Sequence, residues 1–459
     1  MNLLHLMPAL GPGGPTRALL ALIKEFRRSR PDVRHTVVSV AAGDHLPLAF
    51  ALRREGAEIE RAAGVEQVSG HVERADVVLV HFWNTPRLWR VLAGPLPPAR
   101  FVIWSHVLGV HPPQRFNNSL LASATRLAFT APPPADLLAQ VQHARVIPAL
   151  ADAARVNGVS AKPHDGFNAD YVGTTNRGKL HPRFVTMMAR LAIPDLKVRI
   201  CGGALEPAMA AEVAATPEPG RFECRGFVED IASILETSDV FAFALAEQTY
   251  AASDLALQEA MLAGVPPVVL PHGGSNRFIT DGENGIIASN EDAFVAAIEY
   301  LHRNPERRAA MARNARRSAQ ALFSPEKQGA ELFGLLQEAS QAPKTWLLPA
   351  HGPASDKQCS AAVLFLMSQD WDEAAAETAV DAWRAGRTDA LMNYASELDD
   401  DAFQIEGGIL HWRRETLDDP LLRSWSALWL MRQGRVDDAR QEMAEAVRLG
   451  APVGAVSGL

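Results

Sequence analysis

The sequence has 459 residues, of which 47% are hydrophobic, and this is enough to form the cores of about three domains. Its formal net charge is −8 and no block of lysine and arginine stands out, so the composition argues against binding to a nucleic acid. The cysteines Cys201, Cys224 and Cys359 are too widely spaced for a metal-binding pair or a disulfide framework, and no apolar run reaches the roughly 18 residues of a spanning helix, which predicts a cytoplasmic protein.

Residues 1–165 alternate between strand-like and helix-like segments. Leu3–Met7 is predicted as a strand, a loop containing Gly13 and Gly14 follows, and Thr16–Arg28 is predicted as an amphipathic helix. A further helix is expected at 46–55, and further strands at 35–40, 75–81, 100–106, 126–130 and 145–147. A strand, a glycine loop and a helix in this order form half of a βαβ unit, so we expect a doubly wound parallel sheet in this domain.

Two of these predicted strands end in a histidine, at His81 and His106. Ligands of open α/β sheets bind outside the carboxyl ends of the strands. Both side chains are therefore candidates for contact with a ligand. The alternative for each is a loop histidine that is hydrogen-bonded within the protein.

A second series of strands and helices occupies residues 166–340. It follows the segment Ala151–Asn168, which lacks periodicity and is predicted to link two domains. Strands are expected near residues 171, 198, 222, 240 and 268, and helices at 290–303, 305–322 and 325–338. This alternation predicts a second doubly wound sheet.

The stretch Glu247–Ala288 carries the most chemical information. Ser253 or Asp254 is predicted to cap a helix that runs through LALQEAMLA to Gly264, and two prolines follow it. A helix that starts after a loop offers free N–H groups and a positive dipole end to an anion. Glu259 is placed to bind a ribose diol while the helix start holds phosphate. The alternative is an ordinary α/β helix with a surface glutamate.

This stretch resembles the donor-binding half of retaining GT-B glycosyltransferases, in particular glycosyltransferase family 4. In that family a Glu, seven residues and a second Glu precede an A-M-x-x-G-x-P-V-V strand and a G-G loop, and the second Glu falls on Glu259. The first Glu would fall on Ala251, so Glu247 and Asp254 are the nearby carboxylates that we carry as catalytic candidates. The resemblance covers about three quarters of the chain and implies two Rossmann-like domains that face a cleft.

The same resemblance assigns roles at other positions. A family strand ending in V-G is followed by an Arg and a Lys that neutralise the donor diphosphate; here Gly173 ends the strand, Thr174 replaces the Arg and Lys179 matches the Lys. The family also places a functional histidine where this chain has His106. The remaining candidates are Gly13 and Gly14 near the phosphates, Gly226, Phe227 and Val228 near the nucleobase, and Ser253 and Leu255 at the diphosphate. The alternatives are a solvated surface lysine at 179 and a tight turn at the two N-terminal glycines.

Residues 356–459 are predicted to form a third, all-helical domain after a Pro/Gly linker at 342–355. Two segments look alike, LFLMSQDWDEAAAETAVDAWRAG and LWLMRQGRVDDARQEMAEAVRLG, and each has an apolar helix, a short break and an Ala-rich helix. This pattern resembles the helix–turn–helix unit of tetratricopeptide repeats and predicts a surface for a protein partner or for self-association. The alternative is a packed helical extension that braces the rest of the chain.

Two functional hypotheses follow. The first is a retaining glycosyltransferase that moves a sugar from a nucleotide-diphosphate sugar to a glycan, lipid-linked or protein acceptor, with no tightly bound cofactor and no metal. The second is a GT-B scaffold that has lost transfer and binds a partner through its C-terminal helices, which the residues at 251 and 174 favour. The basic residues of the helix at 16–28 add an expected weak contact with anionic lipid at the inner face of the membrane, against the alternative of a solvated helix face.

Overall fold

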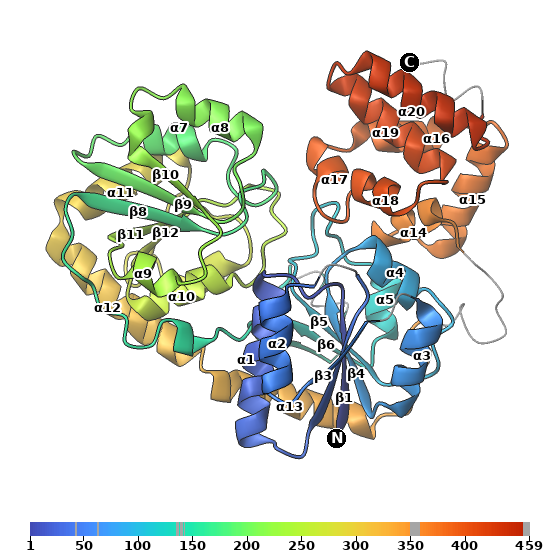
Figure 1. Cartoon of the computed structure of the whole chain (residues 1–459), viewed down its shortest axis with the longest axis horizontal. Coiled ribbons are helices and arrows are strands. Elements are labelled where there is room, and N and C mark those ends of the chain that lie inside the picture. The colour runs from blue at the N-terminus through green and yellow to red at the C-terminus, as the bar shows by residue number, and fades with distance from the viewer. Residues whose placement is uncertain are drawn as a thin grey trace.

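The computed structural model describes residues 1–41, 44–61, 64–134, 137, 141, 143–348 and 359–452. These residues form two parallel sheets with helices on their faces, followed by a C-terminal group of helices (Figure 1). The fold class predicted from the sequence, two Rossmann-like domains and an all-helical extension, is confirmed. None of the helices in the described ranges is long and apolar enough to cross a bilayer.

The first sheet has seven parallel strands in the order β3-β2-β1-β4-β5-β6-β7. Their bounds are β1 Asn2–Met7, β2 Arg34–Ser39, β3 Glu58–Arg61, β4 Val77–Phe82, β5 Phe101–Ser105, β6 Arg126–Phe129 and β7 Ala144–Val146. The helices that follow these strands are α1 Gly14–Ser29, α2 Leu46–Arg54, α3 Val65–Arg74, α4 Pro86–Leu92 and α5 Asn118–Ser123. Strand β4 is buried along its whole length because helices cover both faces of the sheet.

The second sheet has six parallel strands in the order β10-β9-β8-β11-β12-β13. Their bounds are β8 Phe167–Val172, β9 Leu196–Cys201, β10 Phe222–Gly226, β11 Val240–Phe243, β12 Pro267–Val269 and β13 Ile286–Ile287. The helices are α7 Phe184–Ala189, α8 Pro207–Ala214, α9 Ile231–Leu235, α10 Leu255–Ala263, α11 Glu291–Arg303, α12 Pro305–Leu322 and α13 Pro325–Gln341, with short 3-10 turns η1 Ala153–Arg155, η2 Pro219–Arg221 and η3 Ser275–Phe278. As predicted, α13 crosses back and packs against α1 and strands β4 to β6 of the first domain.

The C-terminal extension packs on the side of the first domain that carries α4 (Figure 1). Its helices are α14 Ala361–Ser368, α15 Glu373–Arg384, α16 Asp389–Glu397, α17 Asp400–Gln404, α18 Ile409–Glu415, α19 Pro420–Arg432 and α20 Val436–Arg448. Helices α14 and α18 contact α4, and Phe365, Trp412 and Trp425 share one buried cluster with Leu88 and Trp89. The extension therefore braces the first domain. Residues 349–355 of the predicted linker, and 356–358 and 453–459 of the predicted third domain, lie outside the described residues.

Several elements were not predicted from the sequence. They include β3, α3, α4 and the two-residue strand β13. Most residues of β3 are charged, and three of its four residues are exposed at the edge of the sheet, so the apolar pattern of a strand is missing. Its strand conformation is fixed by pairing with β2, which no local pattern reports.

Candidate functional site

The start of α10 faces the loop that follows β8. Helix α10 ends where predicted, at Gly264, whose positive φ of 78° closes the helix. Asp254 occupies the N-cap position, but its side chain does not cap the helix. Instead Lys179 Nζ lies 2.6 Å from Asp254 Oδ1, and the Ser275 hydroxyl donates to Asp254 Oδ2 at 2.8 Å. The expectation that the side chain of Ser253 or Asp254 caps α10 is therefore wrong, since the Ser253 hydroxyl bonds to the Gln258 side chain.

This ion pair affects both the protonation of Lys179 and the hydrogen bonding at the start of α10. Burial lowers the pKa of Lys179, but Asp254 and Tyr250 together raise it by more, so the net shift is upward and the amine stays protonated. Its positive charge is already balanced by Asp254. Within the described chain, no side chain bonds to the first-turn amides of α10, beginning at Leu255. Those amides therefore have no side-chain acceptor of their own, which is what a helix start needs in order to bind an anion.

Glu259 is buried in α10 and forms an ion pair with Arg155 from η1, between the two domains. Burial raises the pKa of Glu259, while Arg155 and Arg17 oppose the rise. Arg17 Nη2 also lies 3.1 Å from Glu229 Oε2, and Arg155 Nη2 donates to the Glu229 carbonyl at 3.0 Å. A helix of the first domain, the linking segment and the second domain thus meet at this carboxylate. Sequence reasoning missed both arginines, because neither belongs to a motif.

The candidates near the expected phosphates and base come from both domains. Gly13 is the N-cap residue of α1, and a side chain on Gly14 would lie 3.9 Å from Leu255 Cδ1, so this loop faces the start of α10. Phe227 is 53% exposed, and the Arg17 guanidinium lies 5.9 Å from its ring centroid. Gly226 and Val228 flank that ring in the sequence and are half-buried. An exposed aromatic ring beside an arginine can stack on a planar ligand.

The remaining candidates lie around this centre. Gly173 follows β8, and its amide donates to the Cys201 carbonyl at 2.9 Å. The Ser253 hydroxyl accepts from the Gln258 amide at 2.8 Å. Burial lowers the pKa of His111, His181 and His272, and the exposed Glu247 carboxylate opposes this lowering at all three. The structure therefore brings Lys179 and Asp254 together but leaves Glu247 among histidines.

The segment after β5 joins the two domains beside His106. Val107 forms an antiparallel bridge with Ala251, and the Leu108 amide donates to the Tyr250 carbonyl at 2.8 Å. Ala251, where the resemblance expects a glutamate, is 3% exposed. The first glutamate of the family pattern is thus replaced by a small side chain at a packed contact between domains.

His106 is the last member of a chain of four buried, hydrogen-bonded histidines. The ring nitrogens lie 2.9 Å apart between His35 Nδ1 and His5 Nε2, 3.1 Å between His5 Nδ1 and His81 Nε2, and 3.0 Å between His81 Nδ1 and His106 Nε2. Sequence reasoning singled out His81 and His106 but missed the other two. The sequence feature that could have pointed to His5 and His35 is a histidine among the apolar residues of each of their strands.

These histidines make the stability of the protein sensitive to acid. Burial lowers the pKa of His35 to about 4 and that of His106 to about 3, below the ordinary value of 6.5. The unfolded chain therefore binds protons that the folded chain excludes, so their contribution is present above pH 6.5 and is lost as the pH falls towards 4. Each histidine contributes at most about 1.4 kcal/mol per pH unit in that window. In urea titrations between pH 7 and 4.5, the free energy of unfolding should fall less steeply in His35→Phe than in the wild type, and parallel curves would contradict the assignment.

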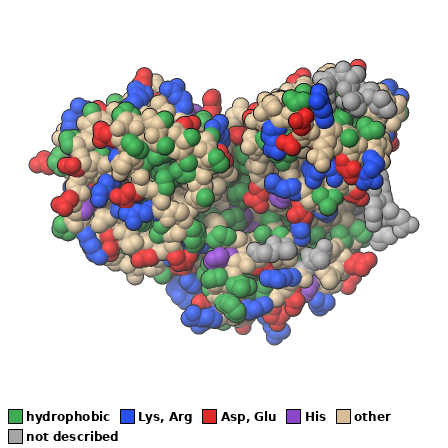
Figure 2. All heavy atoms as spheres, turned by 45° about the horizontal axis from the view of Figure 1, so that its top comes forward, with side chains coloured by type: hydrophobic (Ala, Val, Ile, Leu, Met, Phe, Trp, Pro, Cys, Tyr) green, Lys and Arg blue, Asp and Glu red, His purple; other side chains and the backbone are tan. Residues whose placement is uncertain are grey.

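The extension reaches this site with the turn between α17 and α18. A side chain at Gly178, next to Lys179, would overlap Ile405, so glycine permits the close approach. On the other side, Gln114 Nε2 donates to the Glu406 carbonyl at 2.6 Å. One turn of the extension therefore contacts both Rossmann-like domains. Figure 2 shows the surface hollowed between the lobe of the second domain and the C-terminal helices.

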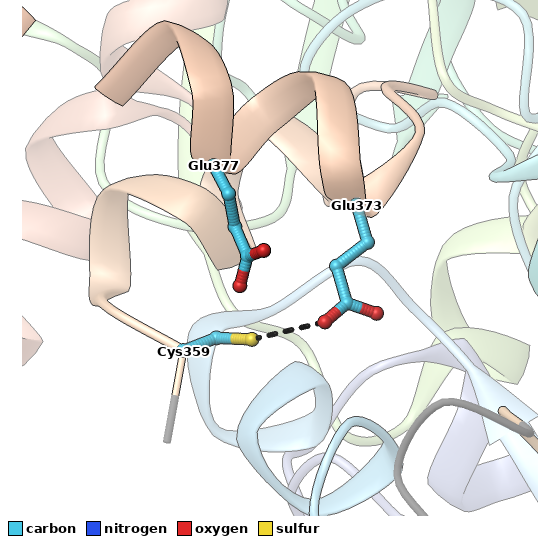
Figure 3. A group of neighbouring side chains, drawn as sticks. All are labelled: Cys359, Glu373 and Glu377. Carbon is cyan, nitrogen blue, oxygen red and sulfur yellow. Dashed lines mark hydrogen bonds between the residues drawn. The ribbon is translucent and has the colours of Figure 1, made fainter. Parts of the chain in front are cut away.

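The described residues contain one group suited to hold a metal, and it lies in the extension. The ligand atoms of Cys359, Glu373 and Glu377 lie within 4.8 Å of one another (Figure 3). The Cys359 thiol donates to Glu373 Oε1 at 3.6 Å. Cys359 lies just before α14, and Glu373 and Glu377 lie on α15, whereas the cations beside α10 are Lys179 and Arg155.

All four basic residues proposed for lipid contact on α1 have acidic partners. Arg17 pairs with Glu229 and Lys24 with Asp152, while Arg27 and Arg28 pair with Glu55 and with Glu25 and Glu326, respectively. These pairs neutralise much of the charge that would attract an anionic surface. The ion pairs therefore favour the alternative, in which this face of α1 is simply exposed to solvent.

Two Rossmann-like domains of this topology that face each other define the GT-B fold. Residues 156–318, which include β8 to α10 and most of α12, match the family model described as glycosyl transferases group 1. No curated protein sequence matches the chain.

Solved structures share the two-domain body. The Anabaena protein Alr3699/HepE in complex with UDP has a TM-score of 0.59 and 18% identity, covering 73% of this chain and 100% of that chain. A glycosyltransferase from Rickettsia africae has a TM-score of 0.59 and 13% identity, covering 74% and 99%. A sucrose-phosphate synthase from Thermosynechococcus elongatus has a TM-score of 0.58 and 16% identity, covering 74% and 99%. About a quarter of this chain, a share similar to that of the helical extension, is unmatched in each comparison.

Proposed function

We propose that the chain is a retaining glycosyltransferase of the family 4 kind, which transfers a sugar from a nucleotide-diphosphate sugar to a glycan, lipid-linked or protein acceptor. The observation that carries the proposal is the start of α10, inside the group 1 match. Its first-turn amides have no side-chain cap, and Lys179, Arg155 and the buried Glu259 surround it. Similar solved structures are described as complexes with UDP and with UDP-glucose.

The proposed chemistry is stabilisation of a leaving group. The amides of α10 and the Lys179 ammonium bind the diphosphate and stabilise the negative charge that grows as the sugar departs. Asp254 holds Lys179 in place and leaves the amides free, because its carboxylate bonds to Lys179 and Ser275. Glu259 accepts the ribose hydroxyls and shares its charge with Arg155. The fixed cations and the helix dipole supply the positive charge that a metal would otherwise bring.

The second candidate is a scaffold that has lost transfer. Three observations favour it: Asp254 already neutralises Lys179, Thr174 replaces an expected arginine, and Ala251 replaces an expected glutamate. In this case the helical extension contributes the partner-binding surface. A donor sugar that binds but is never consumed in the presence of candidate acceptors would favour the scaffold.

Nucleotide binding is tested by thermal and chemical unfolding of the full chain with UDP, GDP, ADP and CMP. One nucleotide should stabilise the protein, and at a concentration 100 times its Kd the gain is about 2.7 kcal/mol. Glu259→Gln keeps the shape of the side chain but removes the charge, so binding should weaken by about 10- to 100-fold, as expected for a lost charged hydrogen bond. Glu283→Gln, an exposed carboxylate of the same domain, is the matched control and should bind like the wild type. The absence of a shift with every nucleotide would refute the proposed donor site.

A further inference from the structure

The four histidines form a staircase across the first sheet. They lie on three neighbouring strands, β2, β1 and β4, and directly after the next strand, β5. The strand register shifts each histidine by two residues towards the carboxyl ends of the strands. His35 lies opposite Leu3, two residues before His5, and His81 lies opposite Trp104, two residues before His106. Their face of the sheet packs against α1 and α13, so the staircase is enclosed until it reaches His106, which is 8% exposed and adjoins the Val107–Ala251 contact between the two domains.

The hydrogen bonds couple the tautomers of all four rings. A neutral imidazole carries one N–H donor and one lone-pair acceptor. Every contact joins the Nδ1 of one ring to the Nε2 of the next. If two neighbouring rings had different tautomers, two donors or two lone pairs would face each other and that hydrogen bond would be lost. The chain therefore has two fully bonded states, with N–H at every Nδ1 or at every Nε2.

The two ends of the chain decide between these states. At the far end His35 Nε2 is sealed from solvent and has no partner among the described residues. A hydrogen on that nitrogen would be a buried donor without an acceptor, which is rarer in proteins than an acceptor without a donor. The other end of the chain is His106 Nδ1. This nitrogen is not among the buried atoms that lack a partner, and no residue that the structure describes donates a hydrogen bond to it. The state with N–H at every Nδ1 is thus favoured.

We propose that His5 and His81 are positioning residues that hold His106 in the Nδ1–H tautomer, with His35 closing the far end of the chain, so that His106 presents a hydrogen-bond donor to the cleft. What this donor meets rests on the proposed function: an oxygen with a free lone pair, on the transferred sugar or on the acceptor. In this tautomer the Nε2 lone pair of His106 accepts from His81 and is turned away from the cleft. His106 therefore orients a hydroxyl oxygen and does not remove a proton from it.

Long-range proton–nitrogen NMR of the full chain, labelled with nitrogen-15 at histidine, tests the tautomers without any ligand. The chain has 14 histidines, and single variants assign the four signals. In the wild type each of the four rings should show a protonated Nδ1 and an unprotonated Nε2. A protonated Nε2 on His106 would overturn the proposal.

Two phenylalanine variants separate positioning from simple packing. His81→Phe cuts His106 off from the chain, so its nitrogen signals should move from those of a single tautomer to averaged values. His35→Phe also removes one buried hydrogen bond, but it leaves His106 connected to His81 and His5, so the His106 signals should stay those of the Nδ1–H form. If His106 keeps one tautomer in His81→Phe, the staircase serves only the register of the sheet. The spectra are independent of nucleotide binding, so a protein with the expected tautomers that binds no nucleotide would refute the proposed function and not this one.

Discussion

Replacement of Trp412 by alanine is expected to lower the free energy of unfolding by about 3–5 kcal/mol, the range for truncating a large buried aromatic side chain. Trp412 in α18 is fully buried, and its ring meets Phe365 edge-on at a centroid distance of 6.1 Å. Its indole N–H has no partner among the described residues, so the loss is one of packing. The same cluster contains Leu88 and Trp89 of the first domain, so the damage should spread beyond the extension.

Urea unfolding followed by circular dichroism measures the size of this effect, and hydrogen exchange shows where it acts. The amides of α4 in the first domain should lose protection together with those of α18. Leu417→Ala is the matched control, because Leu417 is a large apolar residue of the same region that is 62% exposed. Its effect should stay within about 0.5 kcal/mol. If α4 stays protected in Trp412→Ala, the extension is an independent unit and not a brace.

Replacement of Arg199 by methionine is expected to destabilise the second domain by about 3–5 kcal/mol, because it leaves a buried carboxylate without its partner. Arg199 on β9 lies directly opposite Asp170 on β8, and its guanidinium donates to both carboxylate oxygens at 2.6 and 2.5 Å. The Asp170 side chain is fully buried. Burial raises the pKa of Asp170 to about 6 even though the bonds from Arg199 oppose the rise.

An exposed ion pair of similar length shows what burial adds. Arg190 Nη2 and Asp292 Oδ1 are also 2.6 Å apart, but their side chains are 43% and 81% exposed. Arg190→Met should therefore cost less than about 1 kcal/mol. Arg199→Met combined with Asp170→Leu should recover most of the stability, because no charge is then left in the core. Equal effects of the two single arginine variants in urea titrations would contradict this account.

The predicted elements that hold best are those with strong local signals. The helix from Leu255 to Ala263 ends where Gly264 and the two prolines require it. The buried parallel strands appear as apolar runs, such as VVLVHF in β4, because both of their faces are covered. The edge strand β3 has no such signal, since it is charged and exposed and is held only by its neighbour.

The residues of the candidate site show the same contrast between local sequence signals and contacts made only in the folded protein. Motif spacing led to Lys179 and Glu259, and the structure places Lys179 beside the start of α10 and the buried Glu259 within that helix. Their partners were not predictable. Arg155 lies in a segment without periodicity, and the role of Asp254 at the helix start changed because Lys179 and Ser275 compete for its carboxylate.

The sequence by itself determined the class of the fold, because βα periodicity and glycine and proline signals act within a few residues of each other. Only the tertiary structure decided that His5, His35, His81 and His106 form one hydrogen-bonded chain, since each sits on a different strand and the register of the sheet sets their contacts. It also decided that the turn at Ile405 and Glu406 meets both domains. Such contacts join residues tens to hundreds of positions apart, and packing and strand pairing, not local propensity, bring them together.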